Sequence, residues 1–403
     1  MKIAIVGGGA SGLMAAASIL EEKPDAELYI FENSDALGKK ILLTGGGRCN
    51  LTTSITDVNE VLKNYPRGSR FLKFAMHKFS PQDTFEWFEK HHVPLKTETT
   101  MKVYPRSDSA HDIINVFLKI IKNSTTKVIL NCENLQISVN DGHFKINYQS
   151  DKKEYFDKII ICTGSSPEGY NYSRILGHTI TDLAPGLTSI RIDDENVKNF
   201  SGISFKQSKI SVFASKKYCF TGDFLFTHKG VSGPGIFAIA SMSAYENFES
   251  KKCKISFDMI PDKNEEELFT EINRQREFNK SKASNFFSVF AAKKIISYIF
   301  DRTGIDPDKK VCELSNAEIR KLISGLKSLS FTILGRDKGD EFVRAGGVTL
   351  SEIDSKTMQS KICPGLYFAG ELLDVDGFTG GFNLQAAWCT GRLAGLSALK
   401  SFR

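Results

Sequence analysis

The chain begins with MKIAIVGGGASGLMAAASILEE, residues 1–22, and this stretch decides the fold. Lys2 to Val6 form a short apolar run, which predicts a buried β-strand. Three glycines end that run, and the Ala- and Leu-rich segment after them predicts a helix. A strand, a glycine turn and a helix in this order are typical of an α/β fold in which helices cover a parallel sheet.

The glycines of this turn have a spacing that suits a nucleotide. Gly7, Gly9 and Gly12 match G-x-G-x-x-G. The first allows a tight turn, the second lets a pyrophosphate approach the backbone, and the third lets the helix pack on the strand. Ala10 and Ser11 open the predicted helix, whose free N–H groups favour phosphate. A dinucleotide site is therefore predicted here, in preference to a strand-turn-helix that binds nothing.

The next apolar run, ELYIFEN at residues 27–33, supports the same prediction. It ends beside Glu32 and Asn33, about 20 residues after Gly12, where an acid accepts a hydrogen bond from a ribose 2′-hydroxyl. A carboxylate at this place would repel a 2′-phosphate, which disfavours NADP in this particular site.

A second glycine-rich loop follows within GKKILLTGGGRCNLT, residues 38–52, where a simple nicotinamide-binding unit would continue to its next helix. A ligand longer than a mononucleotide, such as FAD, fits between two such loops. Arg48 or Lys39 would balance charge on its phosphates or reduced ring. The alternative is a mobile surface loop, for which Cys49 and Leu51 are unusual. The candidate residues here are Lys39, Lys40, Thr44, Gly46, Gly47, Arg48, Cys49 and Asn50.

The C-terminal stretch from Lys361 to Leu399 repeats this pattern. A short strand leads to Gly370 and Glu371, and a helix is predicted from Phe382 to about Lys400. The N-terminus of that helix would stabilise negative charge on a reduced flavin, and Glu371 would accept from ribityl or ribose hydroxyls. A buried strand and helix joined by a glycine turn is the alternative.

A further strand-to-turn, DKIIICTGSSP at residues 157–167, is predicted to close over the dinucleotide with Thr163 and Gly164. Between it and the C-terminal stretch the pattern changes to short alternating runs and then to helical segments. The predicted fold is thus α/β, with a discontinuous Rossmann-like FAD-binding domain, an inserted β-barrel-like domain and a helical subdomain. The predicted boundaries are 1–190 and 346–403 for the FAD-binding domain, 191–260 and 330–345 for the β domain, and 261–329 for the helical subdomain.

The insertion contains FLFTHKGVSGPG, residues 224–235. His228 is a candidate general acid or base near the flavin, because imidazole titrates near neutral pH. The slightly favoured alternative is that Thr227 and His228 hydrogen-bond a loop that docks the insertion on the FAD-binding domain.

Composition excludes several other classes. The chain has 403 residues, and its eight cysteines include no Cys-x-x-Cys pair, which argues against a zinc site, a disulfide framework and a dithiol reductase. The scattered cysteines also suggest a reducing cytosol, so we expect a cytoplasmic protein. No apolar run reaches about 18 residues, so we expect no membrane span. The net charge of +6 comes from interspersed lysines, which makes nucleic-acid binding an unfavoured expectation.

Four stretches, IVGGGASGLMAA, GKKILLTGGGRCNLT, FTHKGVSGP and AGELLDVDGFTGGFNLQAAW, resemble a known group. The chain is similar to the two-dinucleotide-binding-domain flavoprotein superfamily. More narrowly, it resembles the bacterial aminoacetone oxidase family, also called bile-acid-inducible N-like NAD(P)/FAD-dependent oxidoreductases. The resemblance implies FAD bound at the residues above and at the turn that contains Gly381, Phe382, Asn383 and Gln385. Much of the superfamily has Asp where this chain has Glu371, which leaves the ribityl contact open.

The resulting functional hypothesis is an FAD-dependent oxidoreductase with non-covalently bound FAD. Hydride would pass between the flavin and either NAD(P)H or a small amine-like or alicyclic substrate. No second G-x-G-x-x-G follows a strand, so NAD(P)H is expected as a transient visitor. The alternatives are a flavoprotein that binds or modifies RNA and a flavin-holding protein without turnover. No metal site is predicted, and the sequence predicts no oligomeric state.

Overall fold

The computed structural model describes residues 1–149, 152–250, 252–337 and 343–400. Its chain forms two compact units. Unit 1 comprises Met1–Ala184 and Val343–Arg403, so both ends of the chain contribute to it, and unit 2 is Pro185–Phe342. The predicted boundaries at 190–191 and 345–346 lie a few residues further along the chain than this division.

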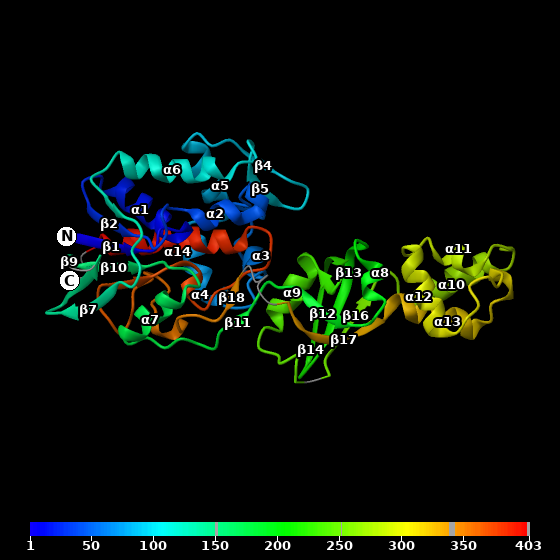
Figure 1. Ribbon diagram of the computed structural model, residues 1–403. Coiled ribbons are helices and arrows are strands. Elements are labelled where there is room, and N and C mark those ends of the chain that lie inside the picture. The colour runs from blue at the N-terminus through cyan, green and yellow to red at the C-terminus, as the bar shows by residue number, and fades with distance from the viewer. Residues whose placement is uncertain (150–151, 251, 338–342, 401–403) are drawn as a thin grey trace. The chain divides into compact units, whose positions relative to one another are not determined.

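Unit 1 is built on a five-stranded parallel sheet (Figure 1). The strand order is β19 (Leu366–Phe368), β10 (Lys158–Ile161), β1 (Lys2–Val6), β2 (Glu27–Phe31) and β6 (Lys127–Ile129). Ile3, Ala4 and Ile5 of the central strand are fully buried, as expected for a parallel sheet that is covered on both faces. The sequence predicts every strand of this sheet except β6.

Helix α1 (Ala10–Glu22) packs against helix α14 (Phe382–Ala398) through glycines. A Cβ atom at Gly391 would lie 2.3 Å from the backbone oxygen of Ser11, and one at Gly395 would lie 2.6 Å from that of Ala15. The two backbones are therefore too close for any side chain at these positions. This contact holds the C-terminal helix beside the first glycine turn.

The other elements of unit 1 surround this centre. The other helices in the first segment of unit 1 are α2 (Lys39–Leu43), η1 (Thr44–Gly47), α3 (Val58–Leu62), α4 (Ser69–Lys78), α5 (Pro81–Lys90), α6 (Ala110–Lys122) and α7 (Pro167–Ile175). Two antiparallel sheets join β3 (Thr52–Thr53), β5 (Lys102–Pro105) and β4 (Leu95–Thr97), and β7 (Gln136–Asn140), β8 (His143–Tyr148) and β9 (Lys152–Phe156). Toward the C-terminus come η3 (Leu350–Glu352) and η4 (Gly370–Leu372). A pair formed by β11 (Ala184–Pro185) and β18 (Arg344–Ala345) lies where the chain passes between the units.

Unit 2 contains a closed six-stranded barrel. The strands follow the order β12 (Ile190–Asp193), β15 (Gly230–Ser232), β14 (Lys217–Phe226), β13 (Ser204–Phe213), β16 (Lys254–Asp258) and β17 (Leu329–Arg336). Alternate residues such as Ile210, Val212 and Phe257 enter the core, because side chains of a strand point to opposite faces in turn. Helices α8 (Val197–Phe200) and α9 (Pro234–Met242) belong to this part of the chain.

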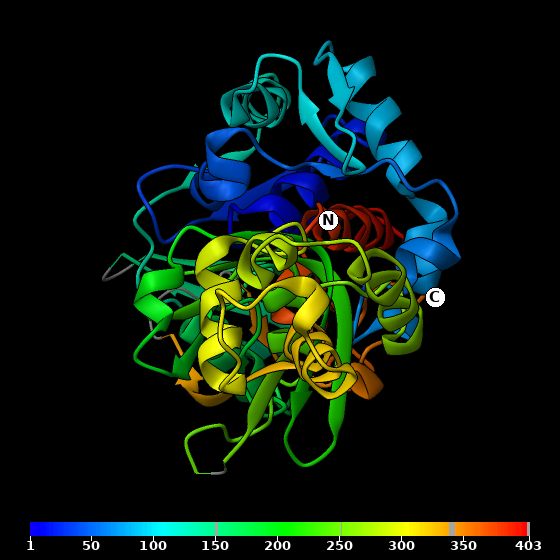
Figure 2. The same ribbon diagram turned by 90° about the vertical axis from the view of Figure 1, so that its right-hand side faces the viewer.

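Four helices and a 3-10 turn lie between β16 and β17 in the chain. They are α10 (Glu265–Arg276), α11 (Ala283–Phe287), α12 (Lys293–Thr303), η2 (Val311–Glu313) and α13 (Asn316–Lys327), which stand together in yellow in Figure 2. Capping boxes begin two of them, at Asn264 with Glu267 and at Ser315 with Glu318. Helical and barrel residues share one hydrophobic cluster. The predicted α/β class, with a Rossmann-like domain, a barrel and a helical part, is confirmed.

The glycine contact between α1 and α14 leads to a stability prediction. Gly391→Ala would force the two backbones apart, and we expect a loss of about 1–3 kcal/mol of unfolding free energy. Thermal unfolding followed by circular dichroism should show a fall of roughly 2–4 °C per kcal/mol. The control is Asn115→Ala on an exposed position of α6, which should change little. Equal midpoints for the two variants would contradict this account of the packing.

Candidate functional site

The first glycine turn is shaped by close backbone contacts. Gly7 has φ +108°, and a Cβ there would lie 2.5 Å from the oxygen of Cys162. A Cβ at Gly12 would lie 1.9 Å from the oxygen of Gly7. By contrast, no heavy atom lies within 4 Å of the position that a Cβ of Gly9 would take. Two glycines therefore let the turn fold, and the third leaves open space for a ligand to approach the backbone.

Glu32 stands directly beside this turn. Its Oε2 atom accepts from the backbone N–H of Gly8 at 2.6 Å, and its Oε1 atom accepts from the N–H and hydroxyl of Ser34 at 2.9 and 2.7 Å. These bonds fix the carboxylate, and they use three of its four acceptor sites. One site remains for a ribose hydroxyl. The neighbouring Asn33 is exposed.

The second loop uses its glycines for backbone conformation. Gly45, Gly46 and Gly47 have φ values of +58°, +68° and +87°, which residues other than glycine rarely adopt. Nothing lies within 4 Å of a Cβ at Gly46, and only one atom, at 3.9 Å, would lie near a Cβ at Gly47. The face of this loop is therefore open, as it is at Gly9. Thr44 stabilises the loop through a 2.7 Å bond from its hydroxyl to the oxygen of Ile41.

Cys49 lies behind this loop, and its side chain is fully buried. Burial raises the pKa of the Cys49 thiol to about 12. The group is therefore a neutral thiol near neutral pH, and neither a nucleophile nor a ready anchor for a covalent flavin.

The predicted cations of this region are held in ion pairs. Arg48 contacts Glu98 at 2.8 Å and Asp108 at 3.6 Å, and its guanidinium lies 4.1 Å from the ring centre of Tyr104. Sequence reasoning did not single out these partners, because they lie some 50 residues away in the chain. Lys39 pairs with Asp35, four residues earlier in the chain.

Lys40 meets a residue from the other end of the chain. Its Nζ atom lies 2.6 Å from Oε2 of Glu371, 331 positions away. Gly164, which has φ +62°, faces the same carboxylate, with Glu371 Oε2 3.7 Å from the position of a Cβ. The structure thus brings together Lys40, Gly164 and Glu371, which the sequence predicts as separate candidates.

Two buried hydroxyl groups near this cluster have no hydrogen-bond partner within the described chain, those of Thr163 and Tyr170. The Thr163 hydroxyl lies against Gly169 of α7, where a Cβ would come within 1.8 Å of it. Burial raises the pKa of Tyr170 to about 12, and the charge of Glu371 also raises it. Tyr170 is therefore a neutral, buried donor, and its hydroxyl has no hydrogen-bond partner among the described residues. Sequence reasoning missed this residue, which no motif marks.

The N-terminus of α14 is fixed by side chains from distant segments. With its side-chain amide in the orientation that satisfies both neighbours, Asn50 accepts from the N–H of Gly381 at 3.0 Å and donates to the oxygen of Thr52 at 3.3 Å. Asn383 accepts from the N–H of Gly377 at 2.8 Å and donates to its oxygen at 2.7 Å, which closes the preceding loop. These two residues therefore shape the turn.

Two further predicted residues support α14 from behind. Gln385 is fully buried, and it accepts from the hydroxyls of Thr52 and Thr84 and donates to the oxygen of Phe79. The backbone oxygen of the buried Phe382 accepts from the hydroxyl of Tyr65 at 2.7 Å. The polar atoms of Gln385 are thus committed to the protein and position the helix.

These groups share one edge of the sheet. Gly7, Glu32, Thr163 and Gly370 each follow the carboxyl end of a parallel strand, where ligands of open α/β sheets bind. Open space beside Gly9 and Gly46 and a carboxylate with a vacant acceptor site suit an elongated dinucleotide with ribose or ribityl hydroxyls. The residues present therefore fit FAD.

His228 belongs to unit 2, in the loop between β14 and β15. The loop is closed by Thr227, whose N–H donates to the oxygen of Gly230 at 2.8 Å and whose hydroxyl accepts from its N–H at 3.1 Å. The imidazole of His228 is exposed. Its proposed part in proton transfer stays a prediction.

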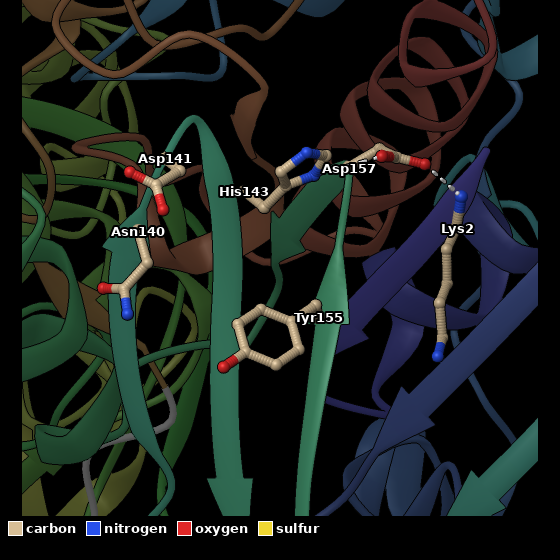
Figure 3. A pocket seen from close by; sticks show the side chains of 6 residues that line it. All are labelled: Lys2, Asn140, Asp141, His143, Tyr155 and Asp157. Atoms are coloured by element: carbon tan, nitrogen blue, oxygen red, sulfur yellow. Dashed lines mark hydrogen bonds and ion pairs between the residues drawn. The ribbon is translucent and has the colours of Figure 1, made fainter.

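A separate cavity of about 440 Å³ lies at the tip of the β7–β9 sheet (Figure 3). Asp157 there accepts from the N–H of Lys2 at 2.7 Å and lies 3.3 Å from His143. No predicted cofactor residue lines it. The lining residues are Lys2, Asn140, Asp141, His143, Tyr155 and Asp157.

Comparison with protein families settles the class of the protein. The model of the HI0933-like protein Rossmann domain matches residues 1–397. The chain belongs to this HI0933-like family. It is a flavin-dependent oxidoreductase with a Rossmann-like FAD-binding domain.

Two named relatives match almost the whole chain. A 3-dehydro-bile acid delta(4,6)-reductase of Clostridium scindens is 29% identical over 98% of this chain and 98% of its own. A ribosomal RNA dihydrouridine synthase of Escherichia coli is 27% identical over 95% of this chain and 94% of its own.

Solved structures show the same fold. A quinol-fumarate reductase with menaquinol matches with a TM-score of 0.51, 13% identity and coverage of 98% of this chain and 70% of that chain. A 3-ketosteroid delta1-dehydrogenase of Sterolibacterium denitrificans in complex with 1,4-androstadiene-3,17-dione matches with a TM-score of 0.50, 10% identity and coverage of 98% and 99%.

The structure also bears on membrane spans and metal sites. No helix among the described residues is long and apolar enough to cross a membrane. Nor do the described residues contain a group of three or more His, Cys, Asp or Glu side chains that would hold a metal ion. The narrower aminoacetone oxidase resemblance stays a prediction.

Glu32 offers a direct test of the proposed cofactor contacts. Glu32→Ala removes the acceptor for a ribose hydroxyl, and we expect FAD affinity to fall by roughly tenfold or more, the effect of losing about 1.5–3 kcal/mol from a charge-assisted bond. The ratio of flavin to protein absorbance after gel filtration measures the loss. Glu133→Ala, at an exposed position of the same unit, is the control. Full flavin content in both variants would remove Glu32 from the site.

The cysteines provide a second test. At pH 8 the buried Cys49, with its pKa near 12, should not react with a thiol reagent, whereas the exposed Cys219 and Cys312 should react. Mass spectrometry after brief labelling identifies the modified residues. Labelling of Cys49 at the rate of Cys312 would show that the loop opens readily, against the packing described here.

Proposed function

We propose that this protein uses FAD to reduce a carbon–carbon double bond conjugated to a carbonyl group. One observation carries the proposal. Two relatives with very different substrates, each aligned over at least 94% of both chains, have names that describe this same bond change. A delta(4,6)-reductase of a 3-dehydro bile acid saturates double bonds beside a ketone. A dihydrouridine synthase saturates the uracil double bond beside a ring carbonyl.

The net reaction balances with a nicotinamide donor. NAD(P)H supplies a hydride and water or a protein group supplies a proton, so that the double bond gains two hydrogen atoms and NAD(P)⁺ leaves. Bound FAD supplies the two-electron chemistry that connects donor and acceptor. Because no second G-x-G-x-x-G follows a strand, the nicotinamide is proposed to visit the site transiently.

The residues of unit 1 would hold the cofactor. Glu32 and Glu371 would accept hydrogen bonds from its hydroxyl groups, and Tyr170 would donate one from its neutral side chain. The open space beside Gly9 and Gly46 would let the cofactor approach the protein backbone closely. The first turn of α14 carries the positive end of the helix dipole, which favours negative charge on a bound ring.

The preferred substrate is a small conjugated ketone, in line with the alicyclic class predicted from the sequence. A second candidate is a uracil base in RNA. It is favoured by the dihydrouridine synthase name of the Escherichia coli relative and by Lys217 and Lys254, which stand on strands β14 and β16, on either side of β13. Both candidates require the same redox chemistry. They differ in the substrate that must bind next to the flavin, a small ketone or a base of an RNA strand.

An anaerobic flavin titration tests the function. NADPH, and then NADH, is added to the holoprotein until the flavin absorbance bleaches, after which a 4,6-dien-3-one steroid or uridine-containing RNA is supplied. Return of the oxidised spectrum with either acceptor, together with the saturated product by mass spectrometry, is the expected result. A flavin that neither nicotinamide bleaches, but that an amine reduces, would replace the reductase proposal with an oxidase.

His228 has a distinct expected signature if it supplies the proton. His228→Gln should slow reduction of the conjugated ketone by about 10²-fold or more, the usual contribution of general acid catalysis. Flavin bleaching by NADPH should be unchanged, because that half-reaction needs no proton at the substrate carbon. Lys229→Gln, its exposed neighbour, is the control. Equal rates for His228→Gln and the wild type would show that His228 does not supply the proton and would favour a structural role in its loop.

A further inference from the structure

The outer surface of the barrel in unit 2 carries an ordered row of side chains. Phe213 of β13 is paired directly with Lys217 of β14 on one side and with Lys254 of β16 on the other. Neighbouring strands lie about 4.8 Å apart, so the three side chains stand next to one another. Lys217 confirms this, since its Nζ atom lies 5.3 Å from the ring centre of Phe213.

These side chains point away from the core. Their sequence neighbours Val212 and Ile255 are buried in the barrel interior, so alternation places Phe213 and Lys254 on the outside. Phe213 is 44% exposed, although a large aromatic side chain is normally covered. An exposed aromatic ring between two lysines offers a surface on which a ring can stack beside positive charge.

The next positions along the strands are small and polar. Ser211 is paired with Cys219 and with Ser256, and beyond them Lys209 is paired with Thr221. We call Lys209, Phe213, Lys217 and Lys254, with these small residues between them, the lysine–phenylalanine face. Ser211 and Ser256 are themselves buried, so the exposed contacts of this face are Phe213 and the lysines.

The charge of this face is largely uncompensated among the described residues. No ion pair is found there for Lys209, Lys217 or Lys254. Two acids lie near this face. Asp258, opposite Lys209, is held by Lys327 at 2.8 Å. Glu246 accepts hydrogen bonds from Ser215 and Tyr218, the residues on either side of Lys216 and Lys217. Lys216 and Lys252, at the adjoining strand ends, are exposed and add to the positive charge.

We propose that the lysine–phenylalanine face binds single-stranded RNA. A base would stack on Phe213, and the lysines on either side would contact phosphates, which is how β-sheet surfaces bind single strands. Phosphates repeat along a strand and match several lysines at once, whereas one small anion would engage only one or two. The proposal extends the RNA candidate of the proposed function, and it concerns binding alone.

Fluorescence anisotropy with the full-length holoprotein tests it. The probe is a labelled oligouridylate of roughly 12 nucleotides. The wild type should bind it at about 50 mM salt and lose affinity steeply toward about 200 mM. Phe213→Ala should weaken binding about tenfold, and Phe213→Tyr should restore it because a tyrosine ring also stacks.

Charge variants supply the second arm. Lys217→Glu/Lys254→Glu should weaken binding by more than tenfold and reduce the slope of log affinity against log salt by about 1.4, the value for two lost phosphate contacts to a single strand. The matched control, Lys119→Glu/Lys122→Glu on exposed positions of α6, changes the net charge equally and should retain most of the affinity. Circular dichroism and flavin content verify that every variant is folded.

Three outcomes would overturn the proposal: no binding of the oligonucleotide by the wild type below about 100 µM, the same loss in both charge variants, or capture of phosphatidylglycerol vesicles in place of RNA. None of them depends on turnover. The two proposals can therefore fail separately. If RNA does not bind, the flavin titration still tests the reduction of conjugated ketones. If the flavin is not reduced, the anisotropy experiment still tests RNA binding.

Discussion

The close contact between α1 and α14 is the constraint on which the rest of the structure depends. Gly391 and Gly395 allow the last helix to lie on the first, because any side chain would strike the backbone at Ser11 or Ala15. The contact joins the two ends of a chain interrupted by unit 2. It thereby sets the turn before α14 beside the first glycine turn, and the proposed cofactor residues all come from these joined ends.

The local parts of this arrangement are predictable from sequence. The run from Lys2 to Val6 and the G-x-G-x-x-G spacing identify the first strand, turn and helix, because each rests on neighbouring residues whose backbone preferences are strong. The alternating runs of the insertion likewise indicate strands, and the structure closes them into a barrel. Closure follows from packing both ends of the sheet together, which no single segment encodes.

The pairings inside the site are not predictable in this way. Lys40 with Glu371, and Arg48 with Tyr104, join residues far apart in sequence, and a lone lysine or tyrosine carries no signal of its partner. Gln385 shows the opposite difficulty. Its place in a motif suggests a ligand contact, but three hydrogen bonds commit it to the protein. Strands β7 and β9 are short and largely exposed, which weakens the hydrophobic period in this part of the sequence.

The two units divide the demands of the proposed chemistry. Reduction of a conjugated double bond asks the protein to hold a flavin and to stabilise charge. Under the proposed function, unit 1 would do this with hydrogen-bonded groups such as Glu32 and Glu371. Choice of substrate asks for a surface that can vary without disturbing the cofactor. A barrel meets this requirement, because its inward residues alone maintain the core and its outward residues are free to change. Under the proposed function, the relatives named for a bile acid and for ribosomal RNA would share the redox unit and would differ in the outer face of the barrel.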